Sequence, residues 1–276
     1  MSGVPTERLD RSRFVLDFDE SFETAILDRD RWLPYYLPQW SSREQSLARY
    51  EIRDEQLRLR IDDDQPPWCP EFDGALRVSN LQTGVFSGSV GSSRGQHQFR
   101  DGLVVREAQD SERLYTPHFG LVEARVKAIA DPRCMVALWM IGCEDVLQHS
   151  AELCVFEIFG SGISASRANI GLGVHPFGDP AMTDEFHTIE LAMDATQFHT
   201  YSVEWVRGRS VFYVDDVPVA RIDQAPDYPL QLMLDVFEFP SENPDPADRY
   251  PKEFIVDFVR GYRPAEVTQM VGIGSP

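Results

Sequence analysis

Two glutamates, Glu152 and Glu157, lie five positions apart in an otherwise apolar segment that runs over residues 151–159. Carboxylates are costly to bury unless a cleft solvates them or a reaction uses them, so this placement indicates chemistry. In a regular strand Glu152 and Cys154 share one face and Glu157 points to the other. A β-bulge after Cys154 would turn Glu157 to the same face, and the two carboxylates could then approach to about 5–6 Å. At that spacing one carboxylate can attack a sugar directly, without an intervening water.

The segments around this pair show the two-residue period of half-buried strands. Residues 122–128 and 201–205 alternate apolar and polar side chains, and residues 209–222 are expected to form a hairpin that turns at Asp215-Asp216. Few stretches have a helical period, and no linker, repeat or low-complexity run divides the chain. The pattern therefore predicts an all-β protein, with two packed antiparallel sheets in a single domain over residues 1–276.

The segment of the two glutamates resembles the active-site strand of family 16 glycoside hydrolases, the laminarinase and lichenase group. The family signature there is Glu, a hydrophobic residue, Asp, two further residues and Glu. Other segments resemble those of the family in the same order, namely residues 18–22 with Trp32, 119–127, 137–140, 198–205, 211–216 and 256–260. The resemblance implies a concanavalin A-like β-sandwich, or jelly roll, with a concave substrate cleft. It also implies Glu152 as nucleophile and Glu157 as general acid and then base.

Three departures from the family pattern lie near the pair. Cys154 stands where the family has the Asp that hydrogen-bonds the nucleophile, and a neutral thiol is a weak donor without charge near pH 7. Met135-Val136 replaces a Trp-Pro pair, which removes one sugar-stacking platform. The family's Trp-Pro lead-in to the first glutamate is also absent from residues 147–151. We expect these changes to leave the fold and the two glutamates in place. The preference for β-1,3-glucan is the property that they can alter.

Four further residues are candidate substrate contacts by the same resemblance. Trp139 occupies the position of a cleft-lining Trp, although simple core packing is the competing interpretation. His175 follows a strand at a point where relatives place a His near the cleaved bond, whereas a lone His is more often structural or exposed. Asp235 lies where relatives carry an Asn, and Glu238 follows it as a further polar contact.

Asp257 matches an Asp that, in many relatives, binds a structural calcium together with backbone carbonyls. One of those carbonyls belongs to an early Gly, and Glu55 occupies that position here. A carbonyl ligand does not itself require Gly, but the turn that presents it can. The resemblance therefore leaves a structural calcium at Asp257 as an open expectation, and no organic cofactor is expected.

Composition restricts the partners. A formal charge of −19 argues against nucleic acid and strongly anionic polymers, which the protein would repel. No run of 18 apolar residues is present, and Met1–Phe14 has no apolar signal core. The four cysteines show neither CxxC nor zinc-finger spacing and are expected to be free thiols. We expect a monomer that acts on a neutral polysaccharide or oligosaccharide away from membranes, in the cytoplasm, or secreted if a leader was removed.

Three functions fit these observations. The first is a retaining endo-acting hydrolase of a neutral β-linked polysaccharide, with β-1,3- or mixed-linkage glucan as the first expectation. The second is a transglycosylase that uses the same residues, and the third is a glycan-binding protein that has lost turnover. Cys154 and the missing Trp-Pro elements motivate the third, and the presence of both glutamates favours an enzyme. The linkage, and the choice between hydrolysis and transfer, are not determined by the sequence.

Overall fold

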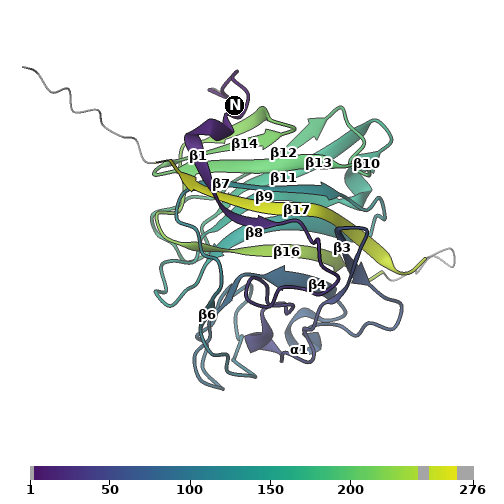
Figure 1. The fold of residues 1–276 in the computed structure, drawn as a ribbon. Coiled ribbons are helices and arrows are strands. Elements are labelled where there is room, and N and C mark those ends of the chain that lie inside the picture. The colour runs from purple at the N-terminus through teal and green to yellow at the C-terminus, as the bar shows by residue number, and fades with distance from the viewer. Residues whose placement is uncertain (1–2, 242–248, 266–276) are drawn as a thin grey trace, which may run out of the picture.

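The structure is a computed structural model that describes residues 3–241 and 249–265. Two large antiparallel sheets form the framework of the molecule, and Figure 1 shows their strands crossing it in stacked layers. Within the described residues the only α-helix is the short α1 (Pro70–Asp73). No helix in this part of the chain has the length and apolar character needed to cross a membrane. The predicted two-sheet sandwich is confirmed.

The first sheet has eight strands, and its long strand β17 pairs with three of them, β7, β3 and β1. The order is β15-β14-β13-β7-β17-β3-β2. Strand β1 also pairs with β17, along residues 259–264, whereas β3 pairs with residues 252–256. The hairpin of β14 and β15 turns at Asp215 and Asp216, both with positive φ, as the sequence predicts. The strands of this sheet are β1 (Phe14–Glu20), β2 (Arg49–Arg53), β3 (Gln56–Ile61), β7 (Gly120–Lys127), β13 (His199–Val206), β14 (Arg209–Val214), β15 (Val217–Ile222) and β17 (Lys252–Pro264).

The second sheet has seven strands and carries the two glutamates; we call it the site sheet. Its order is β10-β11-β9-β8-β16-β4, with β12 paired to β11. Its strands are β4 (Arg77–Gln82), β8 (Cys134–Gly142), β9 (Glu152–Phe159), β10 (Ile163–Ser164), β11 (Arg167–His175), β12 (Glu185–Leu191) and β16 (Leu230–Glu238).

The core lies between the two sheets, and β8 shows how the sequence forms it. Val136, Leu138 and Met140 face the first sheet, whereas Ala137 and Trp139 face the other way. Every residue of β8 is nevertheless buried. A strand that is covered on both faces must be apolar throughout, which explains the continuous apolar run from Cys134 to Gly142.

Loops cover the outer face of the site sheet over β4, β16 and β8. Tyr36, Trp40, Trp68 and neighbouring apolar side chains pack on the outer face of β4, β16 and β8. Figure 1 shows the loops that carry α1 and β6 beside β4 and β16. The short elements of this region are β5 (Gly84–Val85), β6 (Glu112–Arg113) and η2 (Pro38–Trp40), while η1 (Arg11–Arg13) and η3 (Gly160–Gly162) lie elsewhere. Partly exposed side chains on the site sheet are therefore concentrated on β9, β11 and β12.

Candidate active site

A β-bulge in β9 brings the two glutamates together. The pairing of β9 with β8 shifts by one residue at Val155, and the pairing of β9 with β11 shifts at the same place. An extra residue in one strand reverses the facing of the residues after it. Glu157 therefore joins Glu152 and Cys154 on the outer face of the site sheet, as the sequence predicts.

The resulting group is tight. One carboxylate oxygen of Glu152, one of Glu157 and the sulfur of Cys154 all lie within 4.8 Å of one another. Glu152 is 5% exposed and Cys154 is fully buried, whereas Glu157 is only partly buried. Carboxyl groups about 5 Å apart suit direct attack by one of them on a sugar, whereas a separation of about 6.5–9.5 Å leaves room for a water.

Burial and mutual repulsion favour a shared proton. Burial raises the pKa of Glu152 well above its usual range, and the charges of Glu157 and Asp235 raise it further. Burial also raises the pKa of Glu157, while nearby His175 and the Cys154 thiol lower it in part. Two carboxylates this close do not both ionise readily, which favours a state in which the pair holds one proton. One acid and one carboxylate are what acid-assisted attack at a glycosidic bond requires.

The contact of Cys154 differs from the one that the family resemblance implies. The thiol is hydrogen-bonded to Glu157, the more exposed carboxyl, instead of the expected nucleophile Glu152. Burial and the two neighbouring carboxyls raise the pKa of Cys154 well above its usual range, so it remains a neutral donor. The side chain at position 154 therefore acts on the protonation of Glu157.

Trp139 and Asp235 lie on the same outer face, on β8 and β16. Nε1 of Trp139 donates a hydrogen bond to Asp235, and the Trp139 side chain is only 4% exposed among the covering loops. Core packing thus describes Trp139 better than an open stacking surface. Asp235 is fully buried, burial raises its pKa well above the usual range, and its Oδ1 has no partner among the described residues. An unused polar atom of this kind can accept or donate one hydrogen bond to a ligand.

His175 lies beside the pair, as expected. It pairs directly with Glu152 across β11 and β9. Its Nδ1 is hydrogen-bonded to Asp184 at 2.6 Å, and its ring stacks on Phe186 with centroids 4.7 Å apart. These two contacts fix the orientation of the imidazole at the edge of the acid pair.

Glu238 lies apart from Glu152, Cys154 and Glu157. Its position does not support the substrate contact that the resemblance implies. It lies three positions after Asp235 on β16, so strand alternation turns it to the opposite face. Its carboxylate lies 2.5 Å from Arg77 and 2.9 Å from Arg133 and accepts a hydrogen bond from the Tyr250 hydroxyl. Glu238 holds the end of the strand in place instead of facing the glutamates.

The surroundings of Asp257 do not fit a calcium ion well. Asp257 is the extra residue of a bulge in β17 and is ion-paired with Arg125 at 2.6 Å. In the described part of the chain, the one cluster of three or more potential metal-binding side chains is that of Glu152, Cys154 and Glu157. Arg125 already supplies a positive charge to the carboxylate, and a second cation on it would be repelled. Calcium at Asp257 stays a prediction from the resemblance alone.

Two hollows lie near the two ends of β9. One, of about 280 Å³, is lined by Glu157 and by residues of β9, β11 and β12. The other, of about 370 Å³, is lined by Glu144, Ser150, Phe177 and neighbouring residues. Ser150 lies two positions before Glu152 and accepts a hydrogen bond from the backbone N–H of Gly178. The first hollow thus opens directly on Glu157, whereas the second lies near the start of β9, before Glu152.

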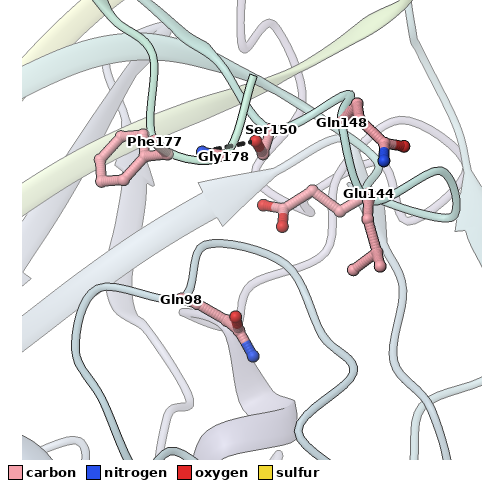
Figure 2. A pocket seen from close by; sticks show the side chains of 7 residues that line it. Gln98, Glu144, Gln148, Ser150, Phe177 and Gly178 are labelled. Atoms are coloured by element: carbon pink, nitrogen blue, oxygen red, sulfur yellow. Dashed lines mark hydrogen bonds between the residues drawn. The ribbon is translucent and has the colours of Figure 1, made fainter. Parts of the chain in front are cut away.

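Glu144, which lines the second hollow, is not among the residues predicted from the sequence. Figure 2 shows its carboxylate extending into that space between Ser150 and Gln98. Burial raises the pKa of Glu144 to about 8. Glu144, His97 and Phe177 all have positive φ, which is strained for such residues and occurs preferentially at functional sites. The only sequence signal was that residues 147–151 depart from the family pattern.

Comparisons with known proteins agree with this geometry. The family model described as glycosyl hydrolases family 16 matches residues 108–243. Among solved structures, the GlcNAcα1-4Gal releasing endo-β-galactosidase from Clostridium perfringens is 27% identical with a TM-score of 0.80. That match covers 95% of this chain and 66% of the clostridial chain, so this chain spans just under two thirds of the length of that enzyme.

Two glucanases share the fold at lower identity. The laminarinase from Flavobacterium sp. UMI-01 is 17% identical with a TM-score of 0.61, over 90% of this chain and all of that one. SCLam, a non-specific endo-β-1,3(4)-glucanase from family GH16, is 17% identical with a TM-score of 0.65, over 95% of this chain and 96% of that one. The comparison with curated proteins gives no match.

Proposed function

We propose that this chain, whose residues 108–243 match the model of glycosyl hydrolases family 16, is a retaining, endo-acting hydrolase of a neutral β-linked glycan. The observation that carries this proposal is the separation of at most 4.8 Å between carboxylate oxygens of Glu152 and Glu157. That spacing excludes a water between the deeper carboxylate and the sugar, and so favours double displacement over single displacement.

The family resemblance assigns the two roles, and they require the proton that the pair shares to lie on Glu157 when Glu152 attacks. The deeper Glu152, as carboxylate, attacks the anomeric carbon while Glu157 gives its proton to the departing glycosidic oxygen. The bond between the anomeric carbon and the glycosidic oxygen breaks, and a glycosyl ester forms on Glu152. Glu157, now ionised and open to solvent, takes a proton from water as the water oxygen attacks the anomeric carbon. The ester bond breaks, Glu152 is released, and two inversions give net retention.

For the substrate, we place β-galactosyl linkages ahead of the β-1,3-glucan that the sequence first suggests. The endo-β-galactosidase relative shares the fold more fully than the glucanases do. The Met135-Val136 replacement of a glucanase stacking element supports the same preference. A β-glucan hydrolase is the second candidate, and transfer to a sugar acceptor uses the same residues.

A substrate screen with matched variants tests the proposal. Purified protein is incubated with neutral β-galactans and β-glucans, products are sized, and the anomeric configuration of the first product is followed by NMR. We expect internal cleavage with retention. Glu152→Gln should abolish turnover, and Glu157→Gln should lose about 10²–10⁴-fold on polymer but much less on an aryl glycoside with a good leaving group.

The control is Glu190→Gln, which changes an exposed glutamate on β12 that pairs with Arg167. This variant should match the wild type on every substrate. An inverted first product, or near-native polymer cleavage by both Glu152→Gln and Glu157→Gln, would overturn the mechanism. A protein that binds these glycans without forming any product would instead be the binding module that the sequence left open.

A further inference from the structure

Two large aromatic rings are exposed at one end of the site sheet. Phe159 is 43% exposed and Phe239 is 36% exposed. Their centroids lie 5.9 Å apart with an angle of 25° between the planes, and the buried Phe237 stacks behind Phe239 at 6.4 Å and 22°. Leaving two stacked phenyl rings in water forfeits hydrophobic stabilisation, so an exposed pair of this kind indicates a surface that binds something.

These rings lie on the same face as the catalytic pair. Phe159 pairs with Met135, and Met135 pairs with Phe237, so these side chains form one row across β9, β8 and β16. Phe159 follows Glu157 by two positions on β9, which places it about 6.6–6.8 Å further along the same face. A single ligand can therefore contact both the carboxyl of Glu157 and the Phe159 ring.

The space between them has the mixed lining that a sugar requires. Phe159 and Glu157 line the hollow of about 280 Å³ together with Asn169, Gly171 and Thr188. A Cβ at Gly171 would lie 2.8 Å from the Phe186 ring and 3.3 Å from the Cβ of Glu157, so the glycine keeps the floor open. A pyranose has an apolar face for an aromatic ring and hydroxyls for amide and hydroxyl groups at the rim.

We propose that Phe159, supported by Phe239, forms a platform for the sugar ring on the leaving-group side of the cleaved bond. This inference rests on the proposed function, because it takes Glu157 as the acid that protonates the departing oxygen. The hollow that shares Glu157 then receives the departing sugar. The second hollow is lined by Ser150, two positions before Glu152 in the chain. The platform binds carbohydrate of the acceptor type, whether it is about to leave or is entering as an acceptor.

The test compares substrates with and without a leaving sugar. Phe159→Leu keeps apolar volume and removes the aromatic face, and Ile26→Ala is the control because Ile26 is 81% exposed. For Phe159→Leu we expect KM for an oligosaccharide extended on the leaving side to rise about 5–10-fold. With a glycosyl fluoride of the same donor sugar, kcat/KM should stay within about twofold. The half-saturating concentration of an added oligosaccharide acceptor should rise by the same factor as KM.

Two results would overturn the platform. One is an equal loss on the fluoride and the oligosaccharide, which would mean that Phe159 supports the acid pair and not a sugar. The other is unchanged KM and unchanged acceptor saturation. Failure of the proposed function is seen separately, since the wild type would then turn over neither substrate. In that case glycan binding to Glu152→Gln, with and without Phe159→Leu, still measures the platform, and equal affinity of the two proteins would refute it.

Discussion

Changing Cys154 to Asp introduces the residue of the family 16 signature and alters the protonation of the proposed catalytic pair, Glu152 and Glu157. The thiol now donates a hydrogen bond to Glu157 and lowers the pKa of that carboxyl. An aspartate would remove this donor and add a negative charge to a group whose members lie within 4.8 Å of one another. Both changes disfavour the ionised form of Glu157, so its pKa should rise.

The size of the effect follows from that distance. Two unit charges 4.8 Å apart interact by about 3.5 kcal/mol at an effective dielectric of about 20, which corresponds to about 2.5 pH units. Glu157 is partly exposed, and solvent and partial protonation of the new carboxyl reduce this value. We expect a rise of about one unit. The general acid works only while protonated, so activity is lost as pH rises through its pKa, and the alkaline limb should move upward by about one unit.

The assay is kcat/KM against pH on the polymeric substrate, where protonation of the leaving oxygen matters most. Cys154→Asn is the matched control, because it has the shape of Asp without its charge. We expect a clear upward displacement of the alkaline limb for Cys154→Asp and a much smaller one for Cys154→Asn. Identical profiles for wild type and both variants would show that position 154 does not act on Glu157, and the reasoning from the bulged strand would be refuted.

Three further predictions concern stability. Burial raises the pKa of Glu144 to about 8, so the folded state binds its proton more tightly than the unfolded state does, and this contribution is lost as pH rises from about 4.5 to 8. Glu144→Gln should therefore be more stable than wild type at pH 9, by up to about 5 kcal/mol, and within about 1 kcal/mol of it at pH 5 in denaturant titrations; the reverse order would contradict the burial argument. Because Arg125 neutralises Asp257, calcium and a chelator should leave the melting temperature within about 1 °C of each other, and a larger calcium-dependent rise would restore the metal site. Glu204 is 3% exposed and ion-paired with Arg13 at 2.5 Å, so Glu204→Ala should lower the free energy of unfolding by about 2–3 kcal/mol. Glu190→Ala, which removes an exposed pair, should cost less than about 1 kcal/mol in the same measurement, and equal losses would refute the importance of burial.

Local patterns in the sequence determined much of this protein. Alternation of apolar and polar residues predicted β7 and β13, and the Asp215-Asp216 pair predicted the hairpin of β14 and β15, because side-chain facing and turn geometry depend on neighbouring residues. The spacing of Glu152 and Glu157 predicted the bulge, since without it two acids of this spacing point to opposite faces. Strand alternation also implies that Asp235 and Glu238, three positions apart, point to opposite faces, so Glu238 was not a sound candidate for the same site.

Other properties of the site were decided only by the tertiary structure. The hydrogen bond from Trp139 to Asp235 joins residues 96 positions apart, and the ion pair of Arg125 and Asp257 joins residues 132 apart. The Phe159 and Phe239 platform likewise depends on strands that are distant in sequence and adjacent through β8. A sequence pattern records which face of its own strand a residue occupies, whereas contacts across a sheet depend on strand order, register and the loops that cover each face. Those are set by packing of the whole chain, and they decided which of the buried acids meet one another and which meet arginine.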